Sequence, residues 1–411
     1  MSAFVHRIAT SMLVVLALLP LLAVAGCWNS REIDKLAIVT AMAIDRTDSG
    51  DFELAFQVVM PGGQSHAGGS GTEMPFTVYG IKSHTLFEGI RKASKQVPRQ
   101  LFFSHVQVVV LGEKLAKAGI REVFDFFERS HEVRLTSMLL VARGAAPDKL
   151  ISTLVPLERL QASAVLGEGQ LSSKLWSEAT VVEIDDVVRK LINPGVEPTI
   201  SGLKLIGKDK AAIEKQSLEQ SRPPYHLEVS DIAMFKEGKL AGWFEGNAAR
   251  GLLFVLNRIR SSIMNLSCGG MPDGVALEII KSKTKNEVSI KDGQLRVHVV
   301  VNTEGNIGEV KCGFPLDNLD ALRGLEREWE DAVKSDIQLA VRKAQQKSTD
   351  VFGFGMMVQR SQPRLWKGME SRWDKIFANA EVNVTFHGII RRTGMRGKSL
   401  MEERDSKGGS S

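Results

Sequence analysis

Cys27 is the residue of this sequence whose position most clearly predicts chemistry. It ends the run Leu22-Ala23-Val24-Ala25-Gly26-Cys27, so small residues stand directly before it. A signal peptidase whose pocket accepts only small side chains needs such residues before the bond that it cleaves. The Cys27 thiol would then carry lipid, and we expect an N-palmitoyl, S-diacylglyceryl cysteine at the start of the mature chain.

The residues before Cys27 follow the pattern of a secretory signal. Arg7 gives the start of the chain a positive charge, and residues 8–25 are uncharged and almost wholly apolar. An uncleaved signal anchor is the alternative, but Pro20 removes a backbone donor from such a helix. Two acyl chains hold a protein on a membrane where one binds only marginally. We therefore expect residues 1–26 to be a signal peptide, and lipid to hold the mature chain on the membrane.

The histidines and the motifs of known enzyme classes give no catalytic arrangement. The sequence has no H-E-x-x-H, C-x-x-C or G-x-S-x-G motif. His105 stands at the start of an apolar strand and His131 stands beside Glu132, positions typical of hydrogen-bonded structural histidines. The sequence therefore indicates an interaction protein, not an enzyme, with no catalytic residue, no metal site and no cofactor.

Two further short patterns also lack the context that their chemistry needs. Asp185 and Asp186 are adjacent, so on a helix their carboxylates point apart and cannot act as an acid–base pair. Gly167-x-Gly169 follows helical sequence, whereas a dinucleotide-binding turn follows a strand.

Cys268 and Cys312 are the two cysteines that remain besides Cys27. In an exported protein they can pair, but two cysteines without a repeated spacing are a weak disulfide signal. We take two separate buried thiols as the more economical interpretation, and the sequence leaves the pairing open.

Composition places a globular body behind the anchor. The chain has 411 residues, of which 43% are hydrophobic and 25% charged, with a formal net charge of +5. Acidic and basic residues are well mixed along the chain, so nucleic acid is not an expected partner.

Hydrophobic periodicity predicts an α+β fold of several domains, with mixed and antiparallel sheets and packed helices. In the first half the pattern alternates between β-branched runs and helical spacing. We expect strands near 36–44, 52–59, 76–79, 106–111, 135–141 and 200–206, and helices near 86–94, 120–129 and within 147–193.

The second half opens with a hairpin, 229–235 and 240–244, around a tight turn with Gly238. A helix near 248–259 and antiparallel strands near 276–280, 287–290 and 295–301 follow. One long amphipathic helix then runs from Leu319 to Ala344 with Asp317 as its N-cap, and a last strand covers 382–390.

These elements suggest five segments, with a loop expected at 61–71. We expect a signal peptide at 1–26, an N-terminal α+β region at 27–206 that can split near 144–147, and a linker or long loop at 207–225. A C-terminal α+β domain at 226–394 and a disordered tail at 395–411 complete the chain.

The ordered motifs of the mature chain resemble the Ger(x)C family of spore germination lipoproteins. Each motif is weak alone, but their order together with the lipidation signal is specific. Ala43 and Ser130-His131 depart from the family pattern at local turns. The motifs are Cys27-Trp28-Asn29-Ser30-Arg31-Glu32-Ile33, Leu36 to Val39, Ile44-Asp45, Phe103-Ser104-His105-Val106, Gly112-Glu113, Phe126-Phe127-Glu128-Arg129, Glu132-Val133-Arg134, Ala233-Met234-Phe235, Gly242-Trp243, Arg250-Gly251-Leu252-Leu253, Trp373, Val382 with Val384, and Arg392-Thr393-Gly394.

The resemblance implies the C subunit of a nutrient germinant receptor, lipid-anchored on the outer face of the spore inner membrane. It implies partners as well, the integral membrane A-type and B-type subunits of that receptor. A solute-binding lipoprotein that captures a nutrient directly is the alternative, and it should show two similar α/β lobes around a deep cleft. The charged segment 129–134 is the surface that we expect to face a partner.

Overall fold

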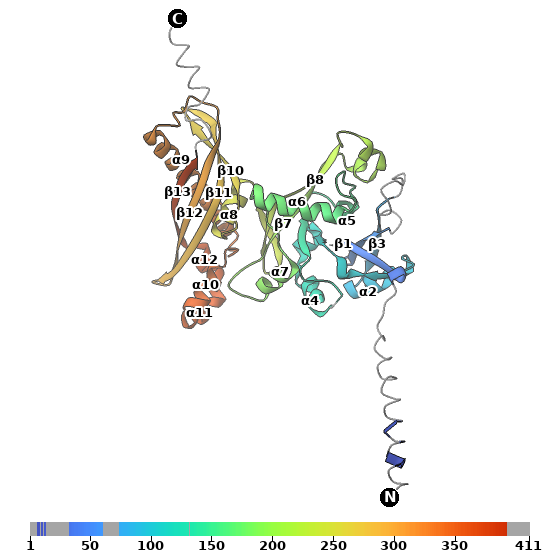
Figure 1. Ribbon diagram of the computed structural model, residues 1–411. Helices are drawn as coiled ribbons and strands as arrows, with labels where there is room; N and C mark the ends of the chain where they lie inside the picture. The colour runs from blue at the N-terminus through green and yellow to red at the C-terminus, as the bar shows by residue number, and fades with distance from the viewer. Residues whose placement is uncertain are drawn as a thin grey trace.

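The computed structural model describes residues 6–8, 10, 12–13, 33–60, 74–130 and 132–392. The signal peptide expected at 1–26, the loop expected at 61–71 and the tail expected at 395–411 lie wholly or mostly outside this part of the chain. The body has two halves arranged side by side, each built on its own sheet (Figure 1). Within the described residues, no helix has the length and apolar character that crossing a membrane requires. The α+β fold class is confirmed.

The first half is built on a nine-stranded mixed sheet. Its centre is the parallel set β1-β5-β6-β7, and antiparallel strands extend it on both sides in the order β3-β2-β1-β5-β6-β7-β8-β9, with β4 pairing parallel to β1. The strands are β1 (Leu36–Arg46), β2 (Phe52–Val59), β3 (Phe76–Ser83), β4 (Gln100–Phe102), β5 (Val108–Leu111), β6 (Met138–Ala142), β7 (Thr199–Gly207), β8 (Tyr225–Lys236) and β9 (Lys239–Phe244).

Helices cover both faces of this sheet, which explains why β5 and β6 are buried along their whole length. Val108 and Val110 of β5 face a core shared with α5 and α6, while Val109 and Leu111 face the core under α2, α3, α4 and α7. These helices are α2 (Leu86–Lys92), α3 (Glu113–Ala118), α4 (Arg121–Arg129), α5 (Pro147–Ser152), α6 (Gln161–Leu175) and α7 (Ile184–Leu191).

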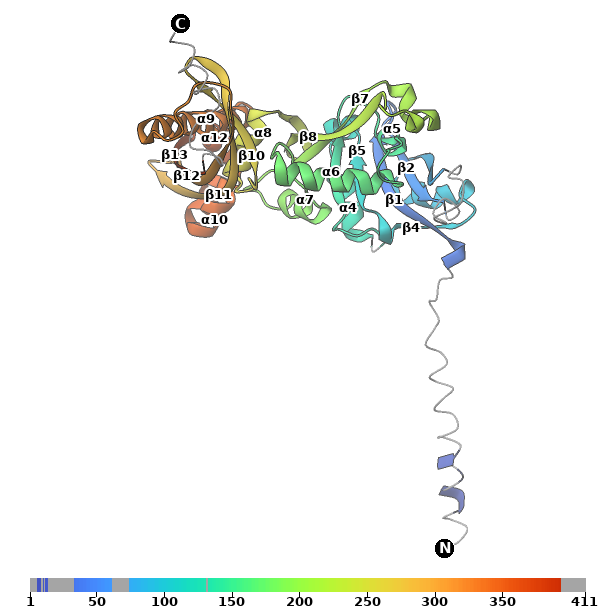
Figure 2. The ribbon, with the colours of Figure 1, turned by 45° about the horizontal axis from the view of Figure 1, so that its top comes forward.

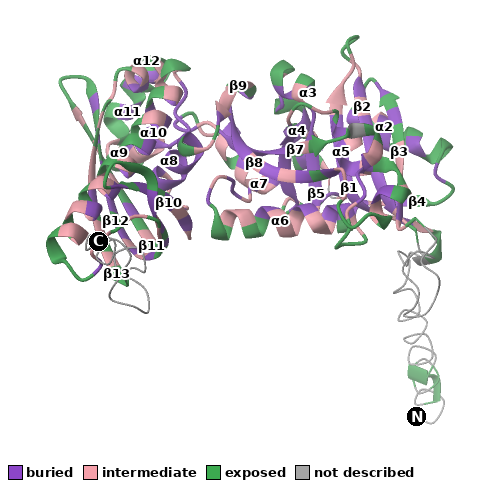
Figure 3. Cartoon of the chain, turned by 90° about the horizontal axis from the view of Figure 1, so that it is seen from above, coloured by how far each residue is buried: buried purple, intermediate pink, exposed green. Residues whose placement is uncertain are grey.

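The hairpin expected to open the C-terminal domain hydrogen-bonds to the N-terminal sheet instead. Strand β8 pairs antiparallel with β7 from Thr199 to Gly207, because the chain doubles back through two short 3-10 helices, Asp209–Ile213 and Lys215–Glu219. Ile232 and Phe244 of the hairpin nevertheless lie in the core of the second half. The hairpin thus belongs to both halves and joins them through buried residues (Figure 3).

The second half packs helices against a four-stranded sheet of order β10-β11-β12-β13. The strands expected separately at 276–280 and 287–290 are one continuous strand, because β11 pairs with β12 from Val275 to Lys291. Its strands and helices are α8 (Asn247–Val255), β10 (Ser262–Cys268), β11 (Met271–Lys291), β12 (Gln294–Val310), α9 (Leu319–Gln346), α10 (Phe354–Ser361), α11 (Pro363–Met369), α12 (Trp373–Ala378) and β13 (Glu381–Arg392).

The long helix α9 begins at Leu319 as predicted, but its N-cap is Asn318 and not Asp317. The Asn318 Oδ1 accepts the backbone N–H groups of Asp320 and Ala321 at 2.8 and 3.2 Å, which satisfies two of the free donors of the first turn. The apolar stripe from Leu325 to Ala344 is buried against the sheet.

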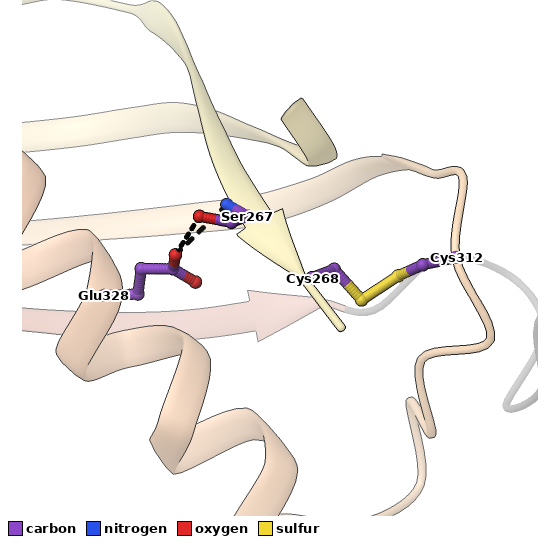
Figure 4. The surroundings of a disulfide bond; sticks show 4 residues. All are labelled: Ser267, Cys268, Cys312 and Glu328. Carbon is purple, nitrogen blue, oxygen red and sulfur yellow. Dashed lines mark hydrogen bonds between the residues drawn. A yellow bond between two sulfur atoms is a disulfide. The ribbon is translucent and has the colours of Figure 1, made fainter. Parts of the chain in front are cut away.

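Cys268 and Cys312 form a disulfide bond, so the interpretation as two separate thiols is wrong (Figure 4). Cys268 ends the edge strand β10, and Cys312 lies two residues beyond the end of β12. The strand β11 lies between these two strands in the sheet. The register of the sheet therefore brings the two cysteines together at one end, which sequence spacing alone does not reveal.

Candidate functional site

The residues predicted to carry the lipid lie outside the described part of the chain. Cys27 and Trp28 belong to the undescribed residues 14–32, and His131 is likewise undescribed. The lipidation of Cys27 therefore stays a prediction from the sequence.

His105 and the carboxylate pair stand apart in the structure. His105 lies exposed on a 3-10 turn, Phe103–His105, with its ring centroid 5.7 Å from that of Phe102. Asp185 and Asp186 open α7, where both carboxylates bind Arg189. Among the described residues, the contacts of the two carboxylates are with a cation and that of His105 is with a phenylalanine ring.

The predicted partner segment 129–134 already makes ion pairs within the body. Arg129 binds Asp125 of the same helix at 2.9 Å, and Glu132 binds Arg91 at 3.0 Å. Arg134 is exposed to solvent. The segment is an accessible charged surface, partly neutralised by its neighbours.

His298 makes a contact that resembles a nucleophile beside a base. Its Nε2 lies 2.8 Å from Thr385 Oγ1, across the β12–β13 pair on the outer face of the second sheet. The nearby carboxylate of Glu287 is hydrogen-bonded to Lys285 at 2.7 Å, and His298 is exposed. A hollow of about 450 Å³ lies over these strands. Without a carboxylate that orients the ring, the contact is an ordinary cross-strand pair.

The described residues also contain no group of three or more His, Cys, Asp or Glu placed to hold a metal ion. Two smaller cavities lie over β2–β3 and α5, at about 220 Å³, and between α9 and β13, at about 160 Å³. Both are below the usual size of a small-molecule pocket.

Several motif residues make the close contacts that hold helices and strands of the body together, which we call joints. The first of these joints is formed by Asp45 and Gly112. The Asp45 Oδ1 accepts the backbone N–H of Leu115 at 2.9 Å, at the first turn of α3. A Cβ on Gly112 would lie 1.9 Å from the Asp45 carboxyl carbon, so only glycine permits this approach. Burial raises the pKa of the Asp45 carboxyl above its usual value, and the bond from Leu115 opposes that rise.

Arg250 and Gly251 hold α8 against α9. The Arg250 Nε donates to Asp336 Oδ2 at 2.8 Å. The Arg250 Nη2 donates to Asn247 Oδ1. Both members of this ion pair are buried, and burial raises the pKa of Asp336 against the pull of Arg250. A Cβ on Gly251 would lie 2.0 Å from the Asp336 carbonyl oxygen. The two helix backbones therefore touch at Gly251.

Asp350 organises the turn between α9 and α10, a role that the sequence reasoning missed. Its carboxylate accepts four backbone N–H groups, from Phe352 to Gly355, at 2.8–3.2 Å. Trp373, one of the motif residues, donates its indole N–H to the same carboxylate at 3.0 Å. Burial raises the pKa of Asp350 to about 6 while these five donors oppose the rise. The run Asp350-Val351-Phe352-Gly353 carries the signal, an Asp two residues before a Phe-Gly turn.

The Asp350 turn also fixes the first half to the second. The Asp350 carbonyl accepts the N–H of Glu197 at 2.8 Å, and Met356 donates its N–H to the Gly195 carbonyl at 3.0 Å. A Cβ on Gly195 would lie 2.5 Å from the Met356 nitrogen. This close contact leaves no room for a side chain between the halves.

The motif tryptophan Trp243 takes part in a second joint. The guanidinium of Arg143 lies 4.7 Å from the Trp243 ring centroid, and it binds Asp231 and Glu245. The Trp243 carbonyl accepts a hydrogen bond from Lys343 of α9 at 3.3 Å. Cation–π and charged contacts thus connect β6, β8 and β9 to the long helix.

Two protein-family models match the chain and together span most of it. The model described as "Spore germination protein N-terminal domain" matches residues 29–205. The model described as "Spore germination B3/ GerAC like, C-terminal" matches residues 230–394.

Individual relatives match over nearly the full length. Spore germination protein KC of Bacillus subtilis (strain 168) is 31% identical over 398 residues, covering 95% of this chain and 98% of that protein. Spore germination protein B3 of the same organism is 25% identical over 386 residues, covering 92% of this chain and 96% of that protein.

A solved structure shares the fold. The crystal structure of the GerBC protein matches with a TM-score of 0.50 and 21% identity, covering 85% of this chain and 96% of that chain. Family models, relatives and fold agree with the motifs, and the chain belongs to the Ger(x)C family of spore germination proteins, the C subunits of germinant receptors.

Proposed function

We propose that this chain is the lipid-anchored C subunit of a spore nutrient germinant receptor and that it acts by holding partner proteins. Cys27 anchors it on the outer face of the spore inner membrane. Its partners are the integral membrane A-type and B-type subunits. Family membership carries the role in germination, and the small residues before Cys27 support the anchor.

The construction of the body supports a holding role. The motif residues Asp45, Gly251 and Trp373 are used in joints between elements, and Gly195 packs directly on the second half. Joints of this kind keep distant surfaces in a fixed relation, which a scaffold needs. The anchor confines that scaffold to the membrane plane, which raises its effective concentration near integral partners without a large contact area.

A solute-binding lipoprotein remains the alternative function and predicts a different body. It should have two similar lobes around a deep cleft. The described halves differ, with nine strands in one sheet and four in the other. Calorimetry of the purified chain against a panel of nutrients separates the two ideas, since direct capture predicts heat with a saturable stoichiometry and a scaffold predicts none.

Cys27→Ala tests the anchor and the holding role together. The variant should leave the membrane fraction of spores, and germination in response to nutrient should be lost. A pull-down of the unmodified chain from spore membranes, followed by mass spectrometry, should recover both integral subunits, and the variant should recover neither. Full membrane partition and normal germination of Cys27→Ala would overturn the anchor. A pull-down of the unmodified chain that recovers neither integral subunit would overturn the holding role.

A further inference from the structure

The chain enters its body at one particular end of the N-terminal sheet. Six peptide steps separate Cys27 from Ile33, and β1 begins three residues later at Leu36. At about 3.3–3.6 Å per residue, Ile33 lies within roughly 20 Å of the lipidated residue. The end of the sheet where β1 begins must therefore lie close to the bilayer.

The sheet register identifies which other segments lie at that end. Leu36 pairs with Gln100 of β4, so Arg99 directly precedes the residue opposite the first residue of β1. Figure 2 shows β4 beside the start of β1. Strand β2 runs antiparallel to β1, so Met60 follows its end at the same level, and Met60 donates its N–H to Pro75. Lys95, four residues before Arg99, ends the short 3-10 helix that leads to β4.

Two free cations and two apolar side chains project from this end. Lys95 and Arg99 are exposed, and neither has an ion-pair partner among residues 33–60, 74–130 and 132–392. Met60 and Met74 keep 40% and 39% of their surface exposed. Asp34 is the exposed acid nearby, while Glu132 is already bound to Arg91. We call Met60, Met74, Lys95 and Arg99 the anchor-end face.

We propose that the anchor-end face docks on the bilayer itself, with Lys95 and Arg99 on the headgroups of anionic phospholipids and the two methionines at their boundary with the acyl chains. The proposal rests on the lipid anchor at Cys27, which brings this face within reach. Its charge complements an anionic leaflet, and methionine is a flexible apolar residue suited to an irregular surface. The face would fix how the body stands on the membrane.

Screening sets the range of this contact. The Debye length is about 8 Å at physiological salt, so Lys95 and Arg99 feel the surface only when they lie within about that distance of it, which is less than the reach of the tether. Each cation near an anionic surface contributes about 1 kcal/mol, so Lys95 and Arg99 together favour the docked orientation roughly thirtyfold.

Hydrogen exchange on the lipidated mature chain, which begins at Cys27, tests the docking. The chain is reconstituted on vesicles of phosphatidylglycerol with phosphatidylcholine, and on vesicles of phosphatidylcholine alone. Peptides covering residues 92–102 should exchange more slowly on the anionic vesicles, and 0.5 M salt should remove that difference. The double variant Lys95→Glu/Arg99→Glu should lose it as well.

Lys208→Glu/Lys210→Glu is the matched control, with the same change of charge. Both lysines are exposed and follow β7, which is parallel to β1, so they lie at the opposite end of the sheet from Leu36. This variant should keep the slow exchange at 92–102. The docking face is wrongly placed if the control variant loses the slow exchange at 92–102 while Lys95→Glu/Arg99→Glu keeps that slow exchange.

Sedimentation with the vesicles separates the failure of the anchor from the failure of the face. If the chain sediments with both kinds of vesicle but peptides 92–102 exchange at the same rate on both, the anchor is supported and the docking face is overturned. Sedimentation with anionic vesicles alone, abolished by salt and by Lys95→Glu/Arg99→Glu, supports the face and overturns the anchor. A chain that sediments with neither overturns both.

Discussion

Opening the Cys268–Cys312 disulfide should lower the free energy of unfolding of the second half by about 4 kcal/mol. The two cysteines are 44 residues apart in the sequence. In the chain-entropy account, closing a loop of that length removes entropy from the unfolded chain worth about 4 kcal/mol at 25 °C. Reduction needs no substitution, so the native packing around Cys268 is otherwise unchanged.

The assay is urea unfolding of the oxidised and the reduced chain, followed by tryptophan fluorescence. Trp329, Trp366 and Trp373 are buried in the second half and report on its unfolding. The reduced chain should unfold at lower urea with a steeper slope, because an open loop exposes more surface. Cys268→Ser/Cys312→Ser should behave like the reduced chain. Equal midpoints, or a loss of 1 kcal/mol or less, would refute the loop argument and favour two independent thiols.

Three further changes test other joints and the holding role. Burial raises the pKa of Asp350 from 3.8 to about 6, so the folded chain keeps a proton that the unfolded chain releases, and the stability that this group contributes is lost as pH rises from about 4 to 6. Urea titrations should therefore show that the advantage of the native chain over Asp350→Asn is larger at pH 4 than at pH 7; an advantage that grows with pH would mean an ionised carboxylate held by its five donors. Gly251→Ala should cost about 1–3 kcal/mol in thermal unfolding because its methyl meets the Asp336 carbonyl, whereas Gly324→Ala on the open face of α9 should gain up to about 1 kcal/mol, and equal effects would contradict the close helix contact. His105→Ala and His298→Ala should leave spore germination normal in stably folded protein, while Arg134→Glu should impair it; a folded histidine variant that fails to germinate, beside a harmless Arg134→Glu, would contradict the holding role.

Local pattern was enough to predict most of the strands and the long helix. The stripe of α9 from Leu325 onward follows the helical period of one buried face, and the unbroken apolar run of β5 is typical of a strand buried on both faces. The lipidation signal that we predict before Cys27 is likewise local, because a signal peptidase would read it along the extended chain.

Features that depend on partners distant in sequence could not be predicted. In the sequence, the polar residues 281–286 indicate a break between two strands. They nevertheless belong to β11, because β12 supplies their backbone hydrogen bonds and Asn257 accepts the N–H of Thr284 at 2.8 Å. The disulfide depends on the sheet register, and the fifth donor to Asp350 is supplied by Trp373, which is distant in sequence and reaches the carboxylate only when it packs on the turn. A single Asp or a single cysteine carries no record of such neighbours.

The parallel pairing of β12 with β13 also determines the order in which the second half can be completed. Strand β12 ends at Val310, and its partner β13 begins only at Glu381, after four helices. The hairpin of β11 and β12 and the Cys268–Cys312 bond can form as soon as residue 312 is available, but the last strand must wait for residues 381–392. Such non-local pairing slows folding. During synthesis or export, this half therefore spends an interval with the β12 edge open, when it is most exposed to aggregation.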